Sequence, residues 1–511
     1  MTQPPVQPRP ARTGPLALGD LLDTTQRAAV TGVSIDSRRV LPGDLYVALP
    51  GQATHGARFA AAAVAAGASA ILTDAEGAAL AAGAGVPVVT VADPRSELAR
   101  VAAEVYGRPA DHLLMLGVTG TTGKTSTTFL LEAGLAAAGL ATATIGTLGF
   151  RLRGQDLPAH RSTVTTPESP DLQALLAVMR ERGAQAVAME VSSHALALHR
   201  ADEITFDVAG FTNLGHDHLD FHHDQESYYR AKASLFLAGR SRIAVVNTDD
   251  PWGERLAAEL RAEGRAQVAT TGGRVENDYR ITHRAPLPDG RTRLRIATPT
   301  GEVEFVLGLL GDFNAANALT ATAMLHLAGI DLAALAGLAT ATVPGRMQRV
   351  PLPGPAPQVV VDFAHTPESV AAALASLPAG RHVVVLGCGG DRDAAKREPM
   401  GQAAARGASV VVVTDDNPRS EDPAAIRAAV LAGARRAAAD TGAEVVDGGD
   451  RRSAIRTALS LASPGDWVAI LGKGHERGQE VAGVVTPFDD VAVATQEWVA
   501  LNQARAGRRD G

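Results

Sequence analysis

Short apolar runs rich in Val, Ile and Leu recur along nearly the whole chain. Examples are LLMLGVTG, QAVAMEV, DVAGFTNL, HVVVLGCGG and SVVVVTDD, and helix-length segments rich in Ala separate many of the runs. A run without polar alternation is typical of a strand that is buried on both faces. Such strands, alternating with helices, predict parallel sheets covered by helices on both sides. The pattern therefore indicates an α/β fold.

The runs form three series, which predict three domains. A smaller N-terminal α/β domain is expected over residues 16–108, a central domain over 109–343 and a C-terminal domain over 344–511. Residues 1–15 are rich in proline and have no apolar core, so we expect a disordered lead-in and not a signal peptide. The length of 511 residues agrees with about three domains of roughly 150 residues each.

Two local patterns predict particular elements. The segment RTRLRIATPTGEVEFVL (291–307) has two alternating runs that flank Pro299-Thr300-Gly301, which favours a turn, so a β-hairpin is expected. The most apolar segment, AAAAVAAGASAIL (60–72), is too short to span a bilayer and consists mainly of Ala. It is expected to be a surface helix that runs into a strand.

Composition and charge narrow the class of protein. Hydrophobic residues make up 46% and charged residues 20%, as in an ordinary soluble globular protein. With a net charge of −7, the chain lacks the excess of basic residues that is typical of a nucleic-acid binder. No segment predicts insertion into a membrane. Cys388 is the only cysteine, so an intrachain disulfide is impossible and a cytoplasmic location is expected. No interface signature stands out, so we expect a monomer.

Polar segments follow the predicted strands directly. Because ligands of open α/β sheets bind outside the carboxyl ends of the strands, these segments predict two functional rims, one on each larger sheet, with a cleft between the domains. The segments are Gly120–Thr125, Glu190–His194, Thr212–Asp220, Asn247–Asp250, Asp362–Pro367, Gly387–Lys396, Asp415–Arg419 and Gly472–Glu476.

The first of these segments predicts a phosphate-binding loop. In GVTGTTGKTS (117–126) the glycines allow backbone N–H groups to close on phosphates, Lys124 reaches the terminal phosphates and Thr125 can hold Mg²⁺. The strict pattern requires glycine at Val118, so the match is to the shorter G-x-x-G-K-T core. The alternative is a glycine-rich turn with a solvent-facing lysine.

Three further residues of the central domain have open interpretations. Glu190, at a strand end, suits a Mg²⁺ ligand or a water-holding base, but it could also cap the next helix. TNLGHDHLDFHHD (212–224) is dense in His and Asp without zinc spacing, which favours His218 as a Mg²⁺ ligand or phosphate contact over zinc; the alternative is a solvated loop. By itself, Lys232 in SYYRAKASLF indicates a surface lysine.

The C-terminal series carries charges suited to an amino acid. Arginine can hold a carboxylate with two parallel hydrogen bonds, and acids can hold an ammonium group. Candidates for these roles are Asp362, His365, Arg392, Lys396, Gly472 and Glu476. In TDDNPRSEDP (414–423), Asn417-Pro418 favours a turn, and Ser420 or Asp422 before Pro423 fits a helix start, so the loop is either a plain turn or also a ligand pocket. Cys388 has no suggestive base, which favours a small buried residue over a nucleophile.

Together these motifs resemble those of the Mur ligases over residues 16 to about 500. TGTTGKT, EVSSH, TNLGHDHLD, GRMQ, DFAHTP, GCGGDRD, DNPR and GKGHE occur in the family's order, as does GxFNxxN at Gly311, Phe313, Asn314 and Asn317. The resemblance is strongest to the branch that adds the third amino acid. It implies the family's three-domain architecture: a small N-terminal α/β domain, a central phosphate-loop ATPase-like parallel sheet and a Rossmann-like C-terminal domain.

The resemblance also implies an ATP-dependent acid–amino-acid ligase of peptidoglycan synthesis, and thus a role in cell-wall formation, cell shape and division. ATP would phosphorylate the D-glutamate carboxylate of UDP-MurNAc-L-Ala-D-Glu, and the amine of meso-diaminopimelate would attack the acyl phosphate. Mg²⁺ and a carbamylated Lys232 would support phosphoryl transfer. This role replaces the interpretation as a surface lysine, which rested on the segment SYYRAKASLF alone. Both organic substrates are small molecules.

Site residues implied by the resemblance fall into four groups. The catalytic group is Lys124, Glu190, His218 and Lys232, and the metal group is Thr125, Glu190, His218 and the Lys232 carbamate. ATP-binding residues are Gly120, Thr121, Thr122, Gly123, Lys124, Thr125, Ser126, Asn314, Arg346 and Asp362. The UDP-MurNAc-dipeptide group is Ser37, Gln52, Thr54, His55, Thr165, Thr166, Ser192 and Arg200. The amino-acid group is Arg392, Asp416, Asn417, Pro418, Arg419, Gly472 and Glu476, in which Arg419 would pair with the second carboxylate of diaminopimelate.

Several alternatives stay open. The same reaction with lysine or ornithine is the nearest, while folylpolyglutamate ligases are disfavoured because DNPR and GCGGDRD belong together in the tripeptide-forming branch. A phosphate-loop kinase or mechanical ATPase typically has the strict loop and an Asp after an apolar run, and it leaves the third sheet unexplained. A nucleotide-binding regulator without catalysis is disfavoured by the presence of all four catalytic candidates.

Overall fold

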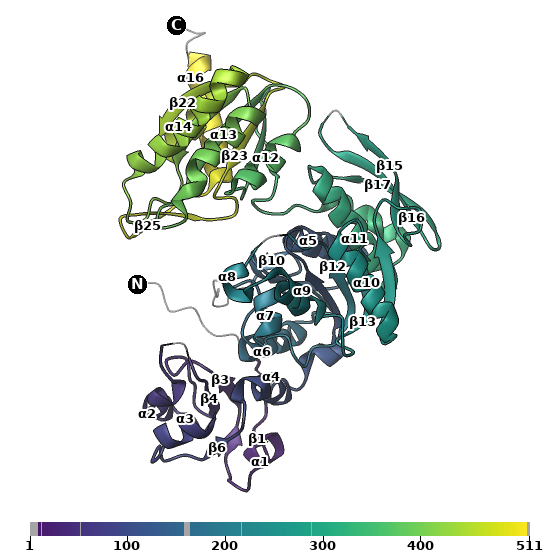
Figure 1. Cartoon of the computed structure of the whole chain (residues 1–511), viewed down its shortest axis with the longest axis vertical. Helices are drawn as coiled ribbons and strands as arrows, with labels where there is room; N and C mark the ends of the chain where they lie inside the picture. Colours follow the sequence, from purple (N-terminus) through teal and green to yellow (C-terminus); the bar gives the residue numbers. More distant parts are fainter. Residues whose placement is uncertain are drawn as a thin grey trace. The chain divides into compact units, whose positions relative to one another are not determined.

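The computed structural model describes residues 9–11, 13–51, 53–157, 164–215, 217–287 and 289–507. The chain divides into two compact units (Figure 1). The first takes its described residues from Met1–Arg284, Leu294–Phe305 and Ala316–Thr340, and the second from Ala285–Arg293, Val306–Ala315 and Ala341–Gly511. No helix among the described residues is long and apolar enough to cross a membrane.

The N-terminal part of the first unit contains a four-stranded parallel sheet. Its strands, in spatial order, are β3 (Gly32–Ser34), β4 (Asp44–Ala48), β5 (Ala70–Thr73) and β6 (Val88–Thr90). A two-stranded sheet is formed by β1 (Leu16–Ala17) and β2 (Ala29–Val30). The helices are α1 (Leu18–Leu21), the 3₁₀ turn η1 (Gly56–Phe59), α2 (Ala60–Ala65), α3 (Ala75–Leu80) and α4 (Pro94–Val105).

Successive residues of β4 point to opposite faces, as the pleat of a strand requires. Leu45 and Val47 pack in the apolar cluster that contains α4, whereas Tyr46 and Ala48 pack in the cluster that contains α2. Helices thus cover both faces of this sheet, as predicted. The expected surface helix running into a strand is also confirmed, as α2 followed by β5.

A mostly parallel sheet of eight strands forms the centre of the first unit. Its spatial order is β10-β9-β8-β11-β7-β12-β13-β14, with β9 and β10 antiparallel at one edge. The strands are β7 (Leu114–Thr119), β8 (Thr142–Gly146), β9 (Gly149–Leu152), β10 (Gln155–Asp156), β11 (Ala186–Glu190), β12 (Phe206–Phe211), β13 (Ser241–Asn247) and β14 (Gln267–Thr271). Because β7 pairs with β11 on one side and β12 on the other, the loops after these three strands lie at one edge of the sheet.

Helices that alternate with the strands along the chain pack on this sheet. α5 packs on β7, β8 and β11, and α10 packs on β13 and β14. The elements are η2 (Pro109–His112), α5 (Lys124–Ala137), α6 (Ser169–Glu181), α7 (Ser193–Ala197), α8 (Leu219–His222), α9 (Gln225–Ala233), α10 (Pro251–Glu263), α11 (Asp312–Leu327) and η3 (Leu332–Thr340).

The predicted hairpin is confirmed. β16 (Thr292–Thr298) and β17 (Gly301–Leu307) are neighbours in a three-stranded sheet with β15 (Arg280–Pro286), and Pro299 and Thr300 form the turn between them. The alternation of β16 is that of a half-buried strand, because Leu294 and Ile296 are buried while Arg293 and Arg295 are exposed.

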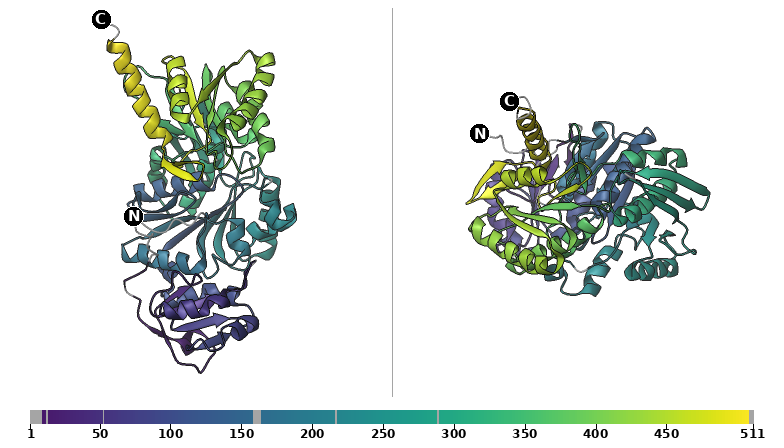
Figure 2. Two further views of the ribbon diagram at one scale, coloured as in Figure 1. Left: turned by 90° about the vertical axis from the view of Figure 1, so that its left-hand side faces the viewer. Right: turned by 90° about the horizontal axis from the view of Figure 1, so that it is seen from above.

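The C-terminal unit is built on a six-stranded sheet of order β18-β19-β23-β20-β21-β22, parallel except for the edge strand β18. The strands are β18 (Gln348–Val350), β19 (Gln358–Asp362), β20 (His382–Cys388), β21 (Val410–Asp415), β22 (Glu444–Gly449) and β23 (Trp467–Leu471), with a separate hairpin of β24 (Gly478–Val481) and β25 (Val484–Pro487). The helices are α12 (Pro367–Ala375), η4 (Ala394–Lys396), α13 (Arg397–Gly407), α14 (Pro423–Thr441), α15 (Arg451–Leu461) and α16 (Asp490–Gly507), the last seen as the yellow helix in Figure 2.

Alternation within the valine runs again places helices on both faces. Val384 packs in the cluster formed with α12, α13 and α14, whereas Val383 and Val385 pack in the cluster formed with α15 and α16. The predicted helix start after DNPR is confirmed as well, because the Asp422 side chain accepts a hydrogen bond from the backbone N–H of Ala424 and Pro423 is the first residue of α14.

Part of the predicted lead-in is described. Arg9 donates hydrogen bonds to the hydroxyl of Tyr106 and to the carboxylate of Asp44. Residues 1–8 and 12 of that segment lie outside the described residues.

Candidate active site

The predicted phosphate loop connects β7 to α5. Gly120 and Gly123 have φ angles of 148° and 86°, in the left-handed region that glycine tolerates, and α5 begins at Lys124. The ammonium group of Lys124 donates to the carbonyls of Gly120 at 2.7 Å and Thr121 at 2.9 Å. The predicted order of strand, loop and helix is therefore confirmed, and the ammonium group of the half-buried lysine lies against its own loop.

Residues that belong to the motifs, but to none of the predicted site groups, hold the loop in shape. The Thr122 backbone N–H donates to the side-chain oxygen of Asn213 at 3.0 Å, and the Thr212 hydroxyl donates to the Thr122 carbonyl at 2.6 Å. A side chain at Gly123 would come within 2.4 Å of the Asn317 side-chain oxygen, so Asn317 packs directly on the loop. Asn317 belongs to the GxFNxxN motif, which was the available signal.

Glu190 is a buried acceptor at the end of β11, with 1% of its surface exposed. One carboxylate oxygen accepts hydrogen bonds from the hydroxyls of Thr125 and Thr147, both at 3.0 Å, and the other accepts the Thr147 backbone N–H at 2.9 Å. The alternative, that Glu190 caps the following helix, is wrong, because the side chain of Ser192 caps α7. Thr147 was missed by sequence reasoning.

Four residues predicted to bind the dipeptide lie beside Glu190. The Thr165 hydroxyl is 3.2 Å from that of Thr147, and the Thr166 hydroxyl donates to the Glu190 carbonyl at 2.9 Å and accepts from the Ser192 backbone N–H at 3.1 Å. Arg200 donates to the Thr166 carbonyl at 3.3 Å and pairs with Glu168 at 2.8 Å. Residues of the predicted phosphate and dipeptide groups are therefore joined by one continuous network of hydrogen bonds.

Lys232, on α9, is buried with 1% of its surface exposed, so the interpretation as a surface lysine is wrong. Its ammonium group donates to the Gly120 carbonyl at 2.8 Å and lies 4.6 Å from the centre of the Tyr228 ring. Burial, with added repulsion from Lys124, lowers the pKa of Lys232 well below its usual value.

His218 has a different environment from the other catalytic candidates. Its side chain is 46% exposed and lies 3.5 Å from the Asp217 carboxylate. Its ring makes an edge contact with the ring of His194 at 4.7 Å. In the described part of the chain, no three His, Cys, Asp or Glu side chains converge to hold a metal ion by themselves.

The predicted uridine-side residues lie after strands β3 and β4, which are parallel neighbours. Ser37 is half-buried in the turn after β3, and Thr54 is exposed in the loop after β4. His55 is buried: one ring nitrogen accepts the Ala57 backbone N–H at 3.0 Å, and the other lies 3.1 Å from the Asp74 carboxylate. Gln52 lies outside the described residues.

Two of the remaining predicted ATP residues meet in the C-terminal unit. Asp362 accepts backbone N–H groups of Met347 at 2.7 Å and Ala364 at 2.8 Å. Burial raises the pKa of Asp362, and the nearby charge of Arg346 opposes that rise. The Arg346 guanidinium lies 4.9 Å from the centre of the Phe363 ring. Asn314 is buried and donates to the Leu310 carbonyl at 2.7 Å.

The DNPR loop follows β21 in the C-terminal unit. Asp416 and Asn417 are 9% and 8% exposed, and Arg419 has a left-handed φ of 52°. The Arg419 guanidinium donates to the Gly390 carbonyl at 2.6 Å and lies 3.7 Å from Glu480. A side chain at Gly390 would come within 2.0 Å of the Pro418 carbonyl, so the glycine allows the GCGG and DNPR loops to touch.

The other predicted amino-acid residues surround this loop. A side chain at Gly472 would come within 2.6 Å of the Asp416 carboxylate, and Glu476 accepts a hydrogen bond from the Asn417 amide at 2.8 Å. Burial raises the pKa of Asp416, partly offset by Arg451 and Lys473. Arg392 is exposed near Asp391, whose pKa is lowered mainly by hydrogen bonds from Ser420 and to a smaller extent by the charges of Arg419 and Arg392. Cys388 is buried as predicted, and burial raises the pKa of its thiol.

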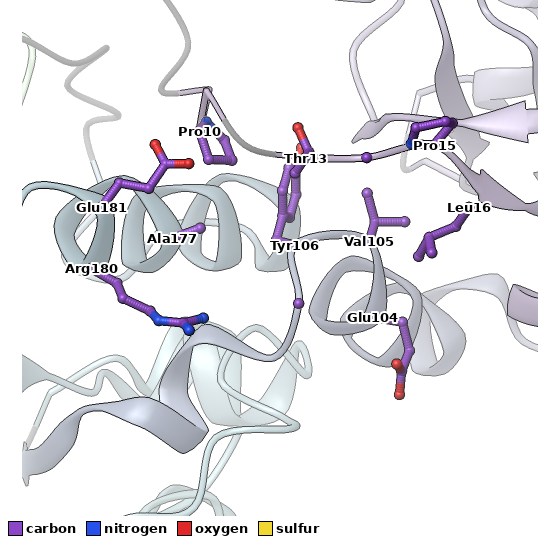
Figure 3. A pocket seen from close by; sticks show the side chains of 12 residues that line it. Pro10, Thr13, Pro15, Leu16, Glu104, Val105, Tyr106, Ala177, Arg180 and Glu181 are labelled. Atoms are coloured by element: carbon purple, nitrogen blue, oxygen red, sulfur yellow. The ribbon is translucent and has the colours of Figure 1, made fainter.

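A separate cavity of about 490 Å³ lies elsewhere in the first unit, between the segment before β1, the end of α4 and the end of α6 (Figure 3). Tyr106 and Val105 line it from one side, and Arg180 and Glu181 from another. None of its lining residues belongs to the predicted site.

Models of one protein family match three successive parts of the chain. The model described as "Mur ligase family, catalytic domain" matches residues 29–106, "Mur ligase middle domain" matches 118–325, and "Mur ligase, glutamate ligase domain" matches 345–474. These three segments correspond to the three series of strands in the sequence.

Curated relatives match nearly the full length. A Streptomyces coelicolor protein named UDP-N-acetylmuramoyl-L-alanyl-D-glutamate--2,6-diaminopimelate ligase is 48% identical over 498 residues, which cover 95% of this chain and 97% of that protein. A Leifsonia xyli protein named UDP-N-acetylmuramyl-tripeptide synthetase is 46% identical and covers 92% of both chains. A solved structure of a UDP-N-acetylmuramoyl-L-alanyl-D-glutamate--2,6-diaminopimelate ligase has 30% identity and a TM-score of 0.72, covering 96% of this chain and 100% of that chain.

Proposed function

This chain belongs to the Mur ligase family, and from that membership we propose that it is an ATP-dependent ligase of peptidoglycan precursor synthesis. It adds meso-diaminopimelate to the D-glutamate carboxylate of UDP-MurNAc-L-Ala-D-Glu. The names of the curated relatives and the matching order of motifs support this assignment. The three domain boundaries at 16–108, 109–343 and 344–511 are part of the same proposal, as are a monomeric state and a cytoplasmic location.

The observation that carries the proposal is the continuity between the phosphate loop and the dipeptide residues. The Thr125 hydroxyl, the Glu190 carboxylate and the Thr147 hydroxyl form a chain of hydrogen bonds that ends beside Thr165. Phosphoryl transfer from ATP to a carboxylate requires the two substrates to be held in contact and in line. A hydrogen-bonded network that joins the proposed phosphate residues to the proposed dipeptide residues would meet this requirement.

The side chains in the first unit fit a Mg²⁺ ion. Thr125 supplies a hydroxyl and Glu190 a carboxylate, and these hard oxygen ligands meet within hydrogen-bond distance. When bound, Mg²⁺ neutralises charge on the transferring phosphoryl group. We propose that Lys124 contacts the same phosphate oxygens and that the backbone N–H groups around Gly120 and Gly123 orient them. We assign His218 to the metal or phosphate contacts on the family motif alone.

Lys232 has the properties that carbamate formation requires. Its neutral amine attacks CO₂, which forms an N–C bond and releases a proton, so a strongly lowered pKa favours the reaction. The amine lies against the Gly120 carbonyl, so a carbamate formed on it would lie next to the phosphate loop. We propose that this carbamate joins Thr125 and Glu190 as a Mg²⁺ ligand.

The reaction then proceeds in two steps, phosphorylation of the carboxylate and attack by the amine. An oxygen of the D-glutamate carboxylate attacks the γ-phosphorus of ATP, and ADP leaves. The amine of diaminopimelate attacks the acyl carbon, loses a proton and expels phosphate to give the amide. In the C-terminal unit, Arg419 binds the distal carboxylate of the amino acid, and Asn417 and Glu476 bind its distal amine.

The test is product formation from purified protein, ATP, Mg²⁺ and UDP-MurNAc-L-Ala-D-Glu, with diaminopimelate, lysine and ornithine in parallel. The proposal predicts phosphate release that depends on both dipeptide and amino acid, and a product whose mass has increased by one diaminopimelate residue. Phosphate release that ignores the acceptor and the amino acid would refute the ligase assignment. Preferred use of lysine or ornithine would correct the amino acid, which the name of the Leifsonia relative does not specify.

A further inference from the structure

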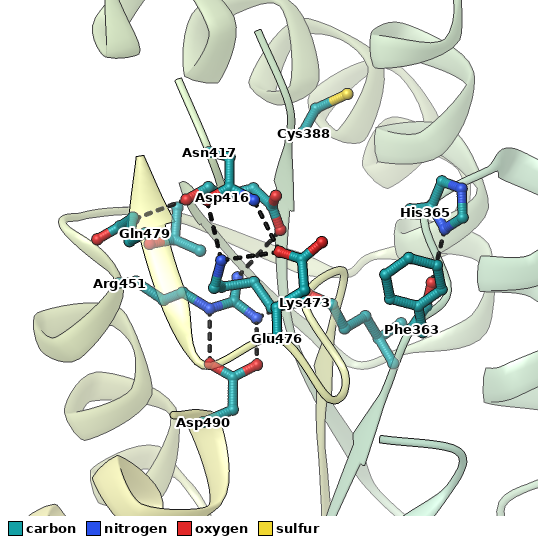
Figure 4. A network of polar contacts seen from close by, with 12 residues as sticks. Phe363, His365, Cys388, Asp416, Asn417, Arg451, Lys473, Glu476, Gln479 and Asp490 are labelled. Carbon is teal, nitrogen blue, oxygen red and sulfur yellow. Dashed lines mark hydrogen bonds and ion pairs between the residues drawn. The ribbon is translucent and has the colours of Figure 1, made fainter. Parts of the chain in front are cut away.

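Lys473 is the second residue of the GKGHE motif, but none of the four groups of predicted site residues contains it. The lysine is buried beneath the DNPR loop (Figure 4). The side chain of Lys473 follows β23 and is completely buried. Its ammonium group donates to the side-chain oxygen of Asn417 at 3.0 Å and to one carboxylate oxygen of Glu476 at 3.1 Å. Burying an ammonium group is costly unless it is paired, so its two partners are held to it strongly.

These contacts determine which way the Asn417 amide points. Its oxygen accepts from Lys473 and also from the backbone N–H of Glu480 at 3.0 Å, while its nitrogen donates to Glu476 at 2.8 Å. A lysine ammonium group has only donors, so the oxygen of the amide must face it. Removal of Lys473 leaves the Asn417 oxygen with one donor, the Glu480 backbone N–H, and leaves the amide nitrogen with a Glu476 carboxylate that is no longer held by the lysine.

The same contacts divide the two oxygens of Glu476. Lys473 and Asn417 both bind Oε2. Oε1 has no hydrogen-bond partner among the described residues, and the side chain is 35% exposed. One oxygen of Glu476 is therefore tied inside the protein and the other is available to a substrate amine.

A second buried ion pair anchors the base of this cluster. Arg451 donates to both oxygens of Asp490, at 2.7 and 2.6 Å, and to the carbonyl of Leu471 at 3.1 Å. Leu471 is two residues before Lys473, so this pair fixes the strand end from which the lysine projects (Figure 4). On the opposite side, Gln479 of the β24–β25 hairpin donates to the Asp416 carbonyl at 2.7 Å.

We propose that Lys473 is a positioning residue that sets Asn417 and Glu476 for the distal amine of the amino-acid substrate. This inference rests on the proposed function for the identity of the substrate. Lys473 acts through the two side chains and does not touch the amino acid. It therefore controls amino-acid recognition and leaves ATP and dipeptide binding unchanged.

The test compares Lys473→Met with Val468→Ala. Met keeps most of the volume and removes the charge and the donors. Val468 is a completely buried apolar residue of β23, the strand that precedes Lys473, so its truncation destabilises the same unit without altering the polar cluster. If Lys473→Met does not fold, Lys473→Gln, which retains a donor, replaces it.

Two readouts are measured for each variant. The first is KM for diaminopimelate, ATP and the UDP-dipeptide, and the second is hydrogen exchange in peptides covering residues 478–482, which report the Glu480 N–H bonded to Asn417. Lys473→Met should raise KM for diaminopimelate about 10-fold or more, keep the other two KM values within about twofold, and accelerate exchange at Glu480. Val468→Ala should lower the thermal midpoint without this KM pattern.

The outcomes separate this inference from the proposed function. Unchanged exchange at Glu480 overturns the positioning role, whatever the substrate. Accelerated exchange with an unchanged KM for the amino acid overturns the role in recognition, and equal increases in all three KM values show a merely structural lysine. If the wild-type protein makes no product with any diamino acid, the proposed function fails, while the exchange measurement still decides whether Lys473 positions Asn417.

Discussion

Replacement of Arg419 by alanine should separate amino-acid recognition from nucleotide binding. The guanidinium is 25% exposed and lies between the Gly390 carbonyl and Glu480, so a charge-assisted pair with a substrate carboxylate is only partly screened. Such a bond contributes about 1.5–3 kcal/mol, which corresponds to a roughly 10- to 150-fold fall in kcat/KM for diaminopimelate. Arg419 has a left-handed φ of 52°. Alanine and arginine both carry a Cβ and have a similar energetic cost in this backbone conformation, so the substitution should not change the strain of the loop.

The assay measures kcat/KM for diaminopimelate and lysine, together with KM for ATP. Lysine has no second carboxylate, so its low activity should change little and the preference for diaminopimelate should collapse. Arg406→Ala, an exposed position of α13 in the same unit with the same charge change, should leave all values unchanged. Equal losses with both amino acids, or a comparable rise in KM for ATP, would refute the assignment of Arg419 to the distal carboxylate.

Four further predictions address other buried groups. Glu190→Gln places an amide against hydroxyl and N–H donors and removes the charge, so kcat should fall about 100-fold or more while KM for the amino acid changes little in steady-state assays; a nearly normal kcat would contradict the metal role. Lys232→Ala should be inactive and partly rescued by a short carboxylate in the buffer, and normal activity without rescue would contradict the carbamate. Because the pKa of Lys232 is lowered on folding, the unfolded chain binds the extra proton and stability rises with pH up to the unfolded value of about 10.4. In calorimetry, the gain in thermal midpoint from Lys232→Met should therefore be larger at pH 6 than at pH 9, and an equal gain would contradict the lowered pKa. Buried Cys388 should react with a thiol reagent only after unfolding, and rapid reaction of the native protein would contradict its burial.

The strands of the parallel sheets were predictable because short stretches of sequence indicate them. The valine runs of β20 and β21 indicate buried strands without knowledge of their neighbours, and Asp422-Pro423 indicates a helix start. The antiparallel strands β9, β10 and β18 were not predicted, because they have only two to four residues each and lie at or next to a sheet edge. Such strands form only where a neighbouring strand supplies hydrogen-bond partners.

The proximity of candidate site residues was predictable where their motifs follow neighbouring strands, as for Thr125 and Glu190. It was not predictable where the partner is distant along the chain. The carbonyl that Lys232 binds is 112 residues away, so the pattern of α9 gives no sign of burial. Thr147 bonds Glu190 across 43 residues, and Lys473 bonds Asn417 across 56. Their roles follow from which strand ends the fold brings together.

The most direct test of the central claim is the transfer of oxygen from the dipeptide to phosphate. UDP-MurNAc-L-Ala-D-Glu labelled with ¹⁸O in the reacting D-glutamate carboxylate is incubated with ATP, Mg²⁺, diaminopimelate and the protein, and the released phosphate is analysed by mass spectrometry. Activation of the carboxylate as an acyl phosphate predicts one ¹⁸O atom in each phosphate released with product. Phosphate without ¹⁸O, or phosphate released at the same rate without dipeptide, would contradict the account.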